Sequence, residues 1–92
     1  DLATSIAQRS VRERMAELLM MLKATYGKPA KKGVRIDLEL SREEMAEMIG
    51  VTQETAIRLL SDFRKDGLID VKDREITILD AEGLIEIANI PL

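Results

Sequence analysis

The segment from 40 to 67, LSREEMAEMIGVTQETAIRLLSDFRKDG, predicts two short helices joined by a tight turn. Ser41 is followed three residues later by Glu44, the pattern of a capping box that begins a helix. Gly50 ends this first helix and permits the left-handed backbone that a tight turn requires. Thr52 can then cap the second helix. Two helices at this spacing are typical of a helix-turn-helix motif.

Apolar and polar residues fall on opposite faces of these two helices. The apolar faces hold Met45, Ala46 and Ile49 in the first helix and Ala56, Leu59, Leu60 and Phe63 in the second. At about 100° per residue, the other side of the second helix carries Glu54, Arg58, Ser61 and Lys65, with Gln53 in its first turn. We therefore expect one face of the second helix to pack inside the domain and the other to remain exposed.

Upstream of the motif, the sequence predicts a long helix followed by a strand. Residues 2–25 are expected to be helical, either continuously or with a break near Ser10, which forms a second capping-box pattern with Glu13. A polar loop is expected at 28–33. Strict alternation of apolar and charged residues then predicts a half-buried strand at 34–40.

Downstream of the motif, two β-rich runs at 68–71 and 75–79 flank residues 72–74 and predict a hairpin. Asp80 then caps a last helix, which Asn89 closes. We interpret residues 1–92 as a single α+β domain of the winged helix-turn-helix class. It has a three-helix core, a small antiparallel sheet with its wing, and a C-terminal helix.

The absence of cysteine and histidine excludes much catalytic and metal-binding chemistry. None of the 92 residues is of either type, which removes disulfides, zinc fingers and every mechanism that relies on an imidazole or a thiol. Glu43, Glu44 and Glu47 cluster on the first motif helix, where acidic residues complement the helix dipole and are expected to be solvated. We therefore expect this chain to be no enzyme and to hold no metal or cofactor.

The sequence contains no signal for a membrane or for export. Its apolar runs are only a few residues long, and no signal peptide is evident, so we expect a cytoplasmic protein without a membrane span. The chain begins with Asp1 rather than Met, which leads us to expect part of a longer protein.

The polar face of the second motif helix carries the candidate DNA-reading residues. Arg58 can bond guanine O6 and N7, Glu54 can accept from the cytosine N4 amino group, and Gln53 can bond adenine N6 and N7. We predict these three as base contacts. The alternative is a solvated face on which Glu54 and Arg58 form an ordinary surface pair. Ile57 either flanks the core or meets a thymine methyl group.

A second set of residues is predicted to contact the DNA backbone. It comprises Ser41, Arg42, Thr52, Thr55, Ser61, Lys65, Lys72 and Arg74. Those near the helix starts are caps and turn residues first, and the last two lie at the predicted hairpin tip. A further basic cluster of Lys28, Lys31, Lys32 and Arg35 is either a solvated loop or a phosphate patch. Because the net charge is -3, any DNA-binding basic surface must be local.

The residues 41–80, SREEMAEMIGVTQETAIRLLSDFRKDGLIDVKDREITILD, resemble the C-terminal DNA-binding domain of the cyclic-AMP receptor protein and fumarate-nitrate regulator (Crp/Fnr) family of bacterial transcription factors. The most specific parts are LSREEMA, IGVT, QETAIR and GLIDVKDREI. Residues 1–22 are similar to the junction that follows the family's long dimerisation helix, with residues 1–9 as the tail of that helix. The resemblance covers most of the chain.

The resemblance implies sequence-specific binding to double-stranded DNA at an inverted repeat, with a recognition helix at about 53–66. It implies a homodimeric transcription regulator, with RNA polymerase as a candidate partner. Glu54 and Arg58 match base-reading positions, whereas Gln53 stands where relatives often carry Arg and Ile57 where a small residue is common. The family's sensory domain, which would bind any effector, is not in this sequence. The alternative function is a winged helix that binds another protein, which the acidic net charge favours.

Overall fold

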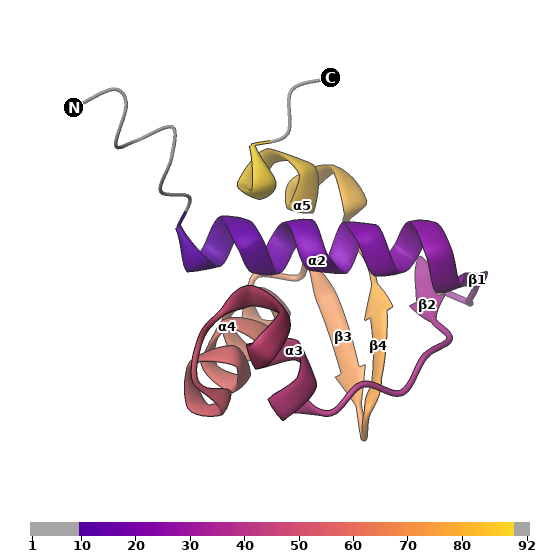
Figure 1. Cartoon of the computed structure of the whole chain (residues 1–92). Helices are drawn as coiled ribbons and strands as arrows, with labels where there is room; N and C mark the ends of the chain where they lie inside the picture. The colour runs from indigo at the N-terminus through magenta and orange to yellow at the C-terminus, as the bar shows by residue number, and fades with distance from the viewer. Residues whose placement is uncertain (1–9, 90–92) are drawn as a thin grey trace.

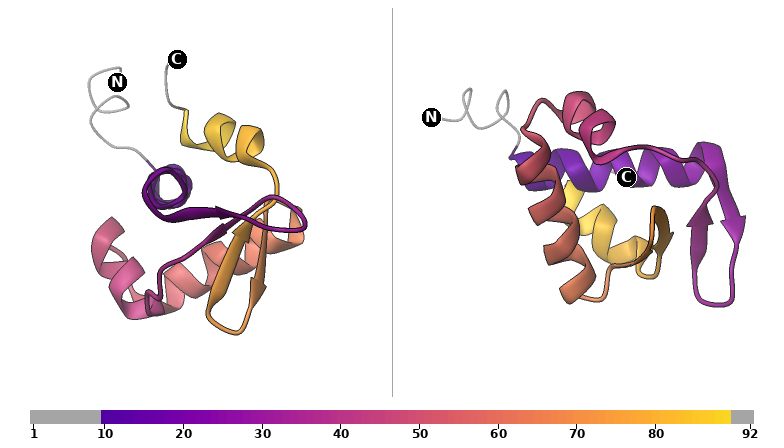
Figure 2. Two further views of the ribbon diagram at one scale, coloured as in Figure 1. Left: turned by 90° about the vertical axis from the view of Figure 1, so that its right-hand side faces the viewer. Right: turned by 90° about the horizontal axis from the view of Figure 1, so that it is seen from below.

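The computed structural model describes residues 10–89 and is built around one long helix (Figure 1). In chain order the elements are α2 Val11–Tyr26, β1 Gly27–Pro29, β2 Val34–Ile36, α3 Arg42–Ile49, α4 Gln53–Lys65, β3 Ile69–Lys72, β4 Glu75–Ile78 and α5 Ala81–Ala88. The helix α5 lies on one side of α2, while α3, α4 and the wing strands β3 and β4 lie on the other (Figures 1 and 2). The arrangement confirms the predicted α+β winged helix-turn-helix with a C-terminal helix.

The α2 helix begins with a complete capping box. The Ser10 hydroxyl accepts a hydrogen bond from the Glu13 backbone N–H at 3.1 Å, and the Glu13 carboxylate accepts one from the Ser10 N–H at 3.2 Å. Ser10 itself has an extended backbone, with φ -65° and ψ 157°. Of the two interpretations of this region, the structure supports the break near Ser10. The expectation for residues 1–9 lies outside the described residues.

The strands form one antiparallel sheet in the order β1-β2-β4-β3. The wing consists of β3, β4 and the turn between them, in which Asp73 has a left-handed backbone with φ 58°. Val34 at the start of β2 pairs with Ile78, at the end of β4 that is farther from the wing turn. The loop between β1 and β2 therefore lies at the opposite end of the sheet from the wing turn, and the two hairpins project in different directions (Figure 2).

Two details of the strand prediction are wrong. The predicted loop at 28–33 is partly strand, because β1 pairs with β2 across it. The strand predicted at 34–40 ends at Ile36, although Leu38 and Leu40 are half-buried and pack against the core. Their alternation with charged residues reflects the burial of one side of a loop, and burial alone produces this pattern without a neighbouring strand.

Apart from Phe63, the buried core is aliphatic, and it draws on every layer of the fold. Its largest fully buried side chains are Phe63, Met15, Leu19, Met45, Ile69, Ile78 and Leu84. No polar or charged residue between 10 and 89 is buried, so apolar burial rather than an internal polar network holds the layers together. Within the same range, no helix has both the length and the apolar character needed to cross a membrane.

Truncating Leu84 tests whether the α5 layer is integral to the fold. Leu84 lies on α5 and is fully buried, so Leu84→Ala is expected to lower the free energy of unfolding by about 2–5 kcal/mol. The matched control Glu86→Ala changes an exposed residue of the same helix and should shift it by less than about 0.5 kcal/mol. Urea unfolding followed by circular dichroism measures both, and equal small effects would contradict the packing described.

Candidate nucleic-acid interface

The helices α3 and α4 are held by the caps and the turn that the sequence predicts. The Ser41 hydroxyl accepts from the Glu44 N–H at 3.0 Å, and the Glu44 carboxylate accepts from the Ser41 N–H at 3.1 Å. Gly50 ends α3 in the left-handed conformation, with φ 73°. The Val51 N–H then donates to the Ala46 carbonyl at 3.0 Å. These bonds satisfy the end of α3 and bring the chain directly into α4.

The start of α4 is fixed by two threonine side chains. The Thr52 hydroxyl accepts from the Thr55 N–H at 3.2 Å and donates to the Thr55 hydroxyl at 3.0 Å. Both threonines therefore have the capping and turn roles that the sequence predicts. Thr52 is exposed. Its hydroxyl oxygen, which caps the first turn of α4, therefore lies at the surface beside the side chains of that turn.

The predicted base-contacting residues are all exposed on α4, Gln53 in its first turn and Glu54 and Arg58 on the side opposite the core. Gln53, Glu54 and Arg58 are all exposed, whereas Ala56, Leu59, Leu60 and Phe63 are buried on the other side. Ser61 and Lys65, predicted as backbone contacts, are exposed as well. We call Gln53, Glu54 and Arg58 the reading face. It has no part in the core, so its side chains are available to a partner.

Glu54 and Arg58 form the surface pair that the sequence offered as an alternative. The Arg58 Nη2 lies 3.7 Å from the Glu54 Oε1, and the two side chains are 71% and 86% exposed, respectively. A solvated pair of this spacing contributes only about 0.2–0.5 kcal/mol. Such a weak interaction is easily exchanged for contacts with a partner, so the pair is compatible with base reading.

Ile57 does not flank the core as one interpretation proposed. Its side chain remains 47% exposed on α4. Packing of a branched apolar side chain against the inner face of the domain would have removed most of this exposure. The remaining interpretation, contact with a thymine methyl group, stays a prediction.

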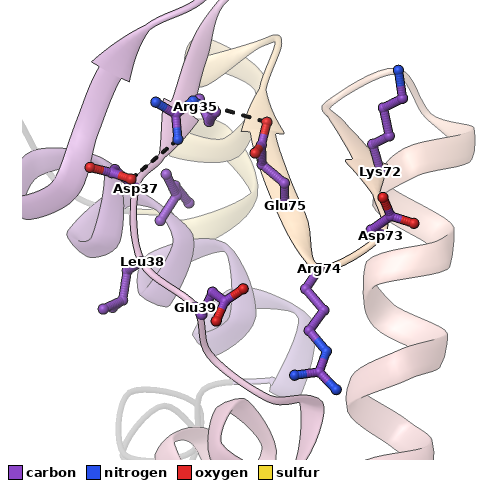
Figure 3. A pocket seen from close by; sticks show the side chains of 9 residues that line it. Arg35, Asp37, Leu38, Glu39, Lys72, Asp73, Arg74 and Glu75 are labelled. Atoms are coloured by element: carbon purple, nitrogen blue, oxygen red, sulfur yellow. Dashed lines mark hydrogen bonds and ion pairs between the residues drawn. The ribbon is translucent and has the colours of Figure 1, made fainter.

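The wing carries basic side chains beside an open hollow in the surface. Lys72 and Arg74 are exposed, and Arg74 extends from the wing turn away from Lys72, whose side chain points in the opposite direction (Figure 3). An open hollow of about 920 Å³ separates the wing from the segment after β2, and Arg35, Asp37, Leu38, Glu39, Lys72, Asp73, Arg74 and Glu75 line it together with Ile36. Lys72 and Arg74 therefore frame one side of a surface that also carries acidic groups.

Arg42, in the first turn of α3, is a further basic group close to Arg74. It is half-buried, and its Nη1 lies 3.9 Å from the Met45 sulfur. Burial lowers the pKa of the Arg42 guanidinium, and the positive charge of Arg74 lowers it further. A positive charge beside the partly buried Arg42 guanidinium favours an anion at this surface. Sequence spacing could not have paired residues from α3 and the wing.

The basic cluster predicted around the first hairpin is divided in the structure. Arg35 lies 3.2 Å from the Asp37 carboxylate and 4.0 Å from that of Glu75 (Figure 3), so acidic neighbours already offset its charge. The three lysines Lys28, Lys31 and Lys32 are exposed on the β1–β2 hairpin. Because that hairpin's loop lies at the far end of the sheet from the wing turn, the lysines form no single patch with Lys72 and Arg74.

Comparison with known proteins places these features in one family. Residues 13–87 match the sequence model described as the Crp-like helix-turn-helix domain. The chain is 39% identical over 74 residues to the global nitrogen regulator of Synechocystis sp., covering 80% of this chain and 33% of that protein. It is 39% identical over 83 residues to the transcriptional regulatory protein btr of Bordetella pertussis, covering 90% and 34%. The chain thus spans about a third of these relatives.

Solved structures give the same result. A mutant of CooA from Carboxydothermus hydrogenoformans matches with a TM-score of 0.82 at 31% identity, over 94% of this chain and 40% of that one. A CRP-family transcriptional regulator from Thermus thermophilus matches with a TM-score of 0.81 at 26% identity, over 94% and 44%.

Replacing Thr52 tests whether its hydroxyl organises the start of α4. Thr52→Ala removes the acceptor of the Thr55 N–H, so the free energy of unfolding should fall by about 1 kcal/mol. Thr52→Ser keeps the oxygen and serves as the matched control, with little loss. Urea unfolding gives the stability, and hydrogen exchange at the Thr55 amide should accelerate in the alanine variant alone. Equal effects of both substitutions would assign the stabilisation to the methyl group instead.

Proposed function

The chain belongs to the Crp-like helix-turn-helix family of DNA-binding transcription regulators, and from this premise we propose that it reads one half of an inverted-repeat operator with α4 in the major groove. The observation that carries the proposal is the composition of the reading face. Gln53, Glu54 and Arg58 are exposed in the first two turns of a helix whose other side is fully packed. Residues near the start of a recognition helix are those that reach base edges.

In the proposed complex, each member of the reading face supplies different hydrogen-bonding chemistry. Arg58 presents the forked donor that matches guanine O6 and N7, Glu54 accepts from a cytosine amino group, and Gln53 offers both a donor and an acceptor to adenine. The methyl groups of Ile57, 47% exposed on the same helix, suit contact with a thymine methyl. Together these groups define one side of a half-site.

Backbone contacts are proposed on both sides of α4. Arg42 on α3 and Arg74 on the wing bring two positive charges near one another. This arrangement suits contact with a phosphate of the DNA backbone at the edge of the groove. Lys72, Ser61 and Lys65 are exposed and add further donors. Ser41, Thr52 and Thr55 are weaker candidates for phosphate contacts, because their hydroxyl groups already form hydrogen bonds at the starts of α3 and α4.

The complete regulator is proposed to act as a homodimer. Two-fold dimers place recognition helices about 34 Å apart, which matches half-sites one helical turn apart. Contact with RNA polymerase, an effector bound outside this domain and action in the bacterial cytoplasm are parts of the same proposal. The relatives are transcription regulators, and Glu43, Glu44 and Glu47 lie exposed on α3, so we propose no enzymatic role for this domain.

Truncating Arg58 tests base reading. A duplex selected from a random pool by the wild-type protein serves as cognate DNA, and a scrambled duplex as the reference. Arg58→Ala should weaken cognate binding by about 1–3 kcal/mol and relax the preference at one base pair. Arg64→Ala removes an equal charge from the last turn of α4 and should affect both duplexes alike. Fluorescence anisotropy measures the affinities of the wild type and both variants for the two duplexes, and equal losses on both duplexes for Arg58→Ala would contradict its role.

The salt dependence of binding tests the phosphate contact of Arg74. Each phosphate contact adds about 0.9 to the slope of log affinity against log salt concentration. Arg74→Met should therefore reduce the slope by about 0.9 and weaken all sequences equally. The matched control is Lys32→Met, which removes a charge from the hairpin at the far end of the sheet and should leave the slope unchanged. Binding that is absent or insensitive to salt, with a protein partner recovered instead, would favour the protein-interaction function.

A further inference from the structure

Arg12 connects the first turn of α2 with the last turn of α4. Its Nη2 lies 3.2 Å from the Asp66 Oδ2, across a separation of 54 residues in the chain. Its guanidinium carbon also lies 4.8 Å from the centre of the Phe63 ring. Phe63 is in the last turns of α4, and Asp66 is the residue that caps its C-terminus. One side chain of α2 therefore contacts the end of α4 at two points.

The two contacts of Arg12 restrain the end of α4 more than either would alone. The Arg12 and Asp66 side chains are 41% and 55% exposed, and an ion pair at that exposure is weak. The planar guanidinium, however, also lies over the Phe63 ring, an arrangement that a lysine ammonium reproduces poorly. Phe63 is fully buried and cannot yield its place without disturbing the core. The Phe63 ring thus supports the Arg12 guanidinium on a rigid surface. The Asp66 carboxylate fixes the direction in which that guanidinium points.

The contact is distant from the reading face but acts on the same rigid helix. At 1.5 Å per residue, the C-terminal cap at Asp66 is about 20 Å from Gln53 along the axis. A tilt of only about 3° at that distance displaces the opposite end of the helix by about 1 Å. Hydrogen bonds to bases tolerate shifts of only a few tenths of an ångström. The orientation of α4 at its far end therefore affects how the reading face meets the groove.

We propose that Arg12 is a positioning residue that sets the tilt of α4 relative to α2, so that discrimination between DNA sequences depends on a side chain outside the reading face. The inference rests on the proposed function, because it concerns how α4 enters the groove. It adds a determinant of specificity on a helix that lies outside the helix-turn-helix motif itself.

The test compares Arg12→Met with a variant of equal charge change. Methionine keeps the apolar length of the side chain and loses both the fork and the charge. Arg64→Met is the matched control, because Arg64 lies on α4 and its acidic neighbour Asp70, 4.0 Å away, belongs to the wing rather than to α2. We expect Arg12→Met to reduce the ratio of cognate to scrambled affinity about fivefold. Arg64→Met should leave that ratio unchanged, and Arg12→Lys should restore part of it.

A second measurement without DNA tests the positioning directly. Residual dipolar couplings of backbone amides report the angle between α2 and α4, under conditions in which circular dichroism shows every variant fully folded. Arg12→Met should change that angle and Arg64→Met should not. An unchanged angle, or equal losses of affinity on both duplexes, would overturn the proposal. If the wild-type protein fails to distinguish the duplexes, the proposed function is wrong, and the couplings alone still decide whether Arg12 positions α4.

Discussion

The burial of α2 on two sides is the constraint on which the remaining structure depends. Its apolar residues pack against α5 on one side and against the helix-turn-helix motif on the other. Because no polar residue between 10 and 89 is buried, these layers have no hydrogen-bonded network to define their relative positions. The close packing of Phe63, Met15 and Leu19 must therefore fix the relative positions of the layers. Peripheral contacts such as that of Arg12 then adjust these positions.

Local chemistry made most of the fold predictable from the sequence. The caps at Ser41 and Thr52 and the glycine at position 50 are decided by interactions within a few residues, and the structure confirms each. The first strand was missed because β1 is a three-residue edge strand with no alternation long enough to read. The overlong strand at 34–40 arose because period-two burial does not reveal whether a pairing partner exists.

The candidate site was predictable to the same extent and for the same reason. Helical spacing placed Glu54 and Arg58 on the side opposite the core and Gln53 in the first turn, and the structure shows all three exposed. The approach of Arg42 to Arg74 and the contact of Arg12 with Phe63 join residues far apart in the chain. Such pairings depend on how complete layers pack, and no local pattern encodes them. What each side chain contacts in DNA remains a prediction.

The Glu54–Arg58 pair also bears on how such a domain searches a chromosome. Paired within the free helix, the two side chains partly offset each other's charge, so under the proposed function this part of α4 would gain little from the phosphates of random sequence. Under the proposed function, affinity for arbitrary DNA would then come from the flanking basic residues, and contacts of that kind allow sliding along a duplex. Under the proposed base reading, a sequence that offers separate partners for the carboxylate and the guanidinium would open the pair, and only there would the helix itself add to residence time.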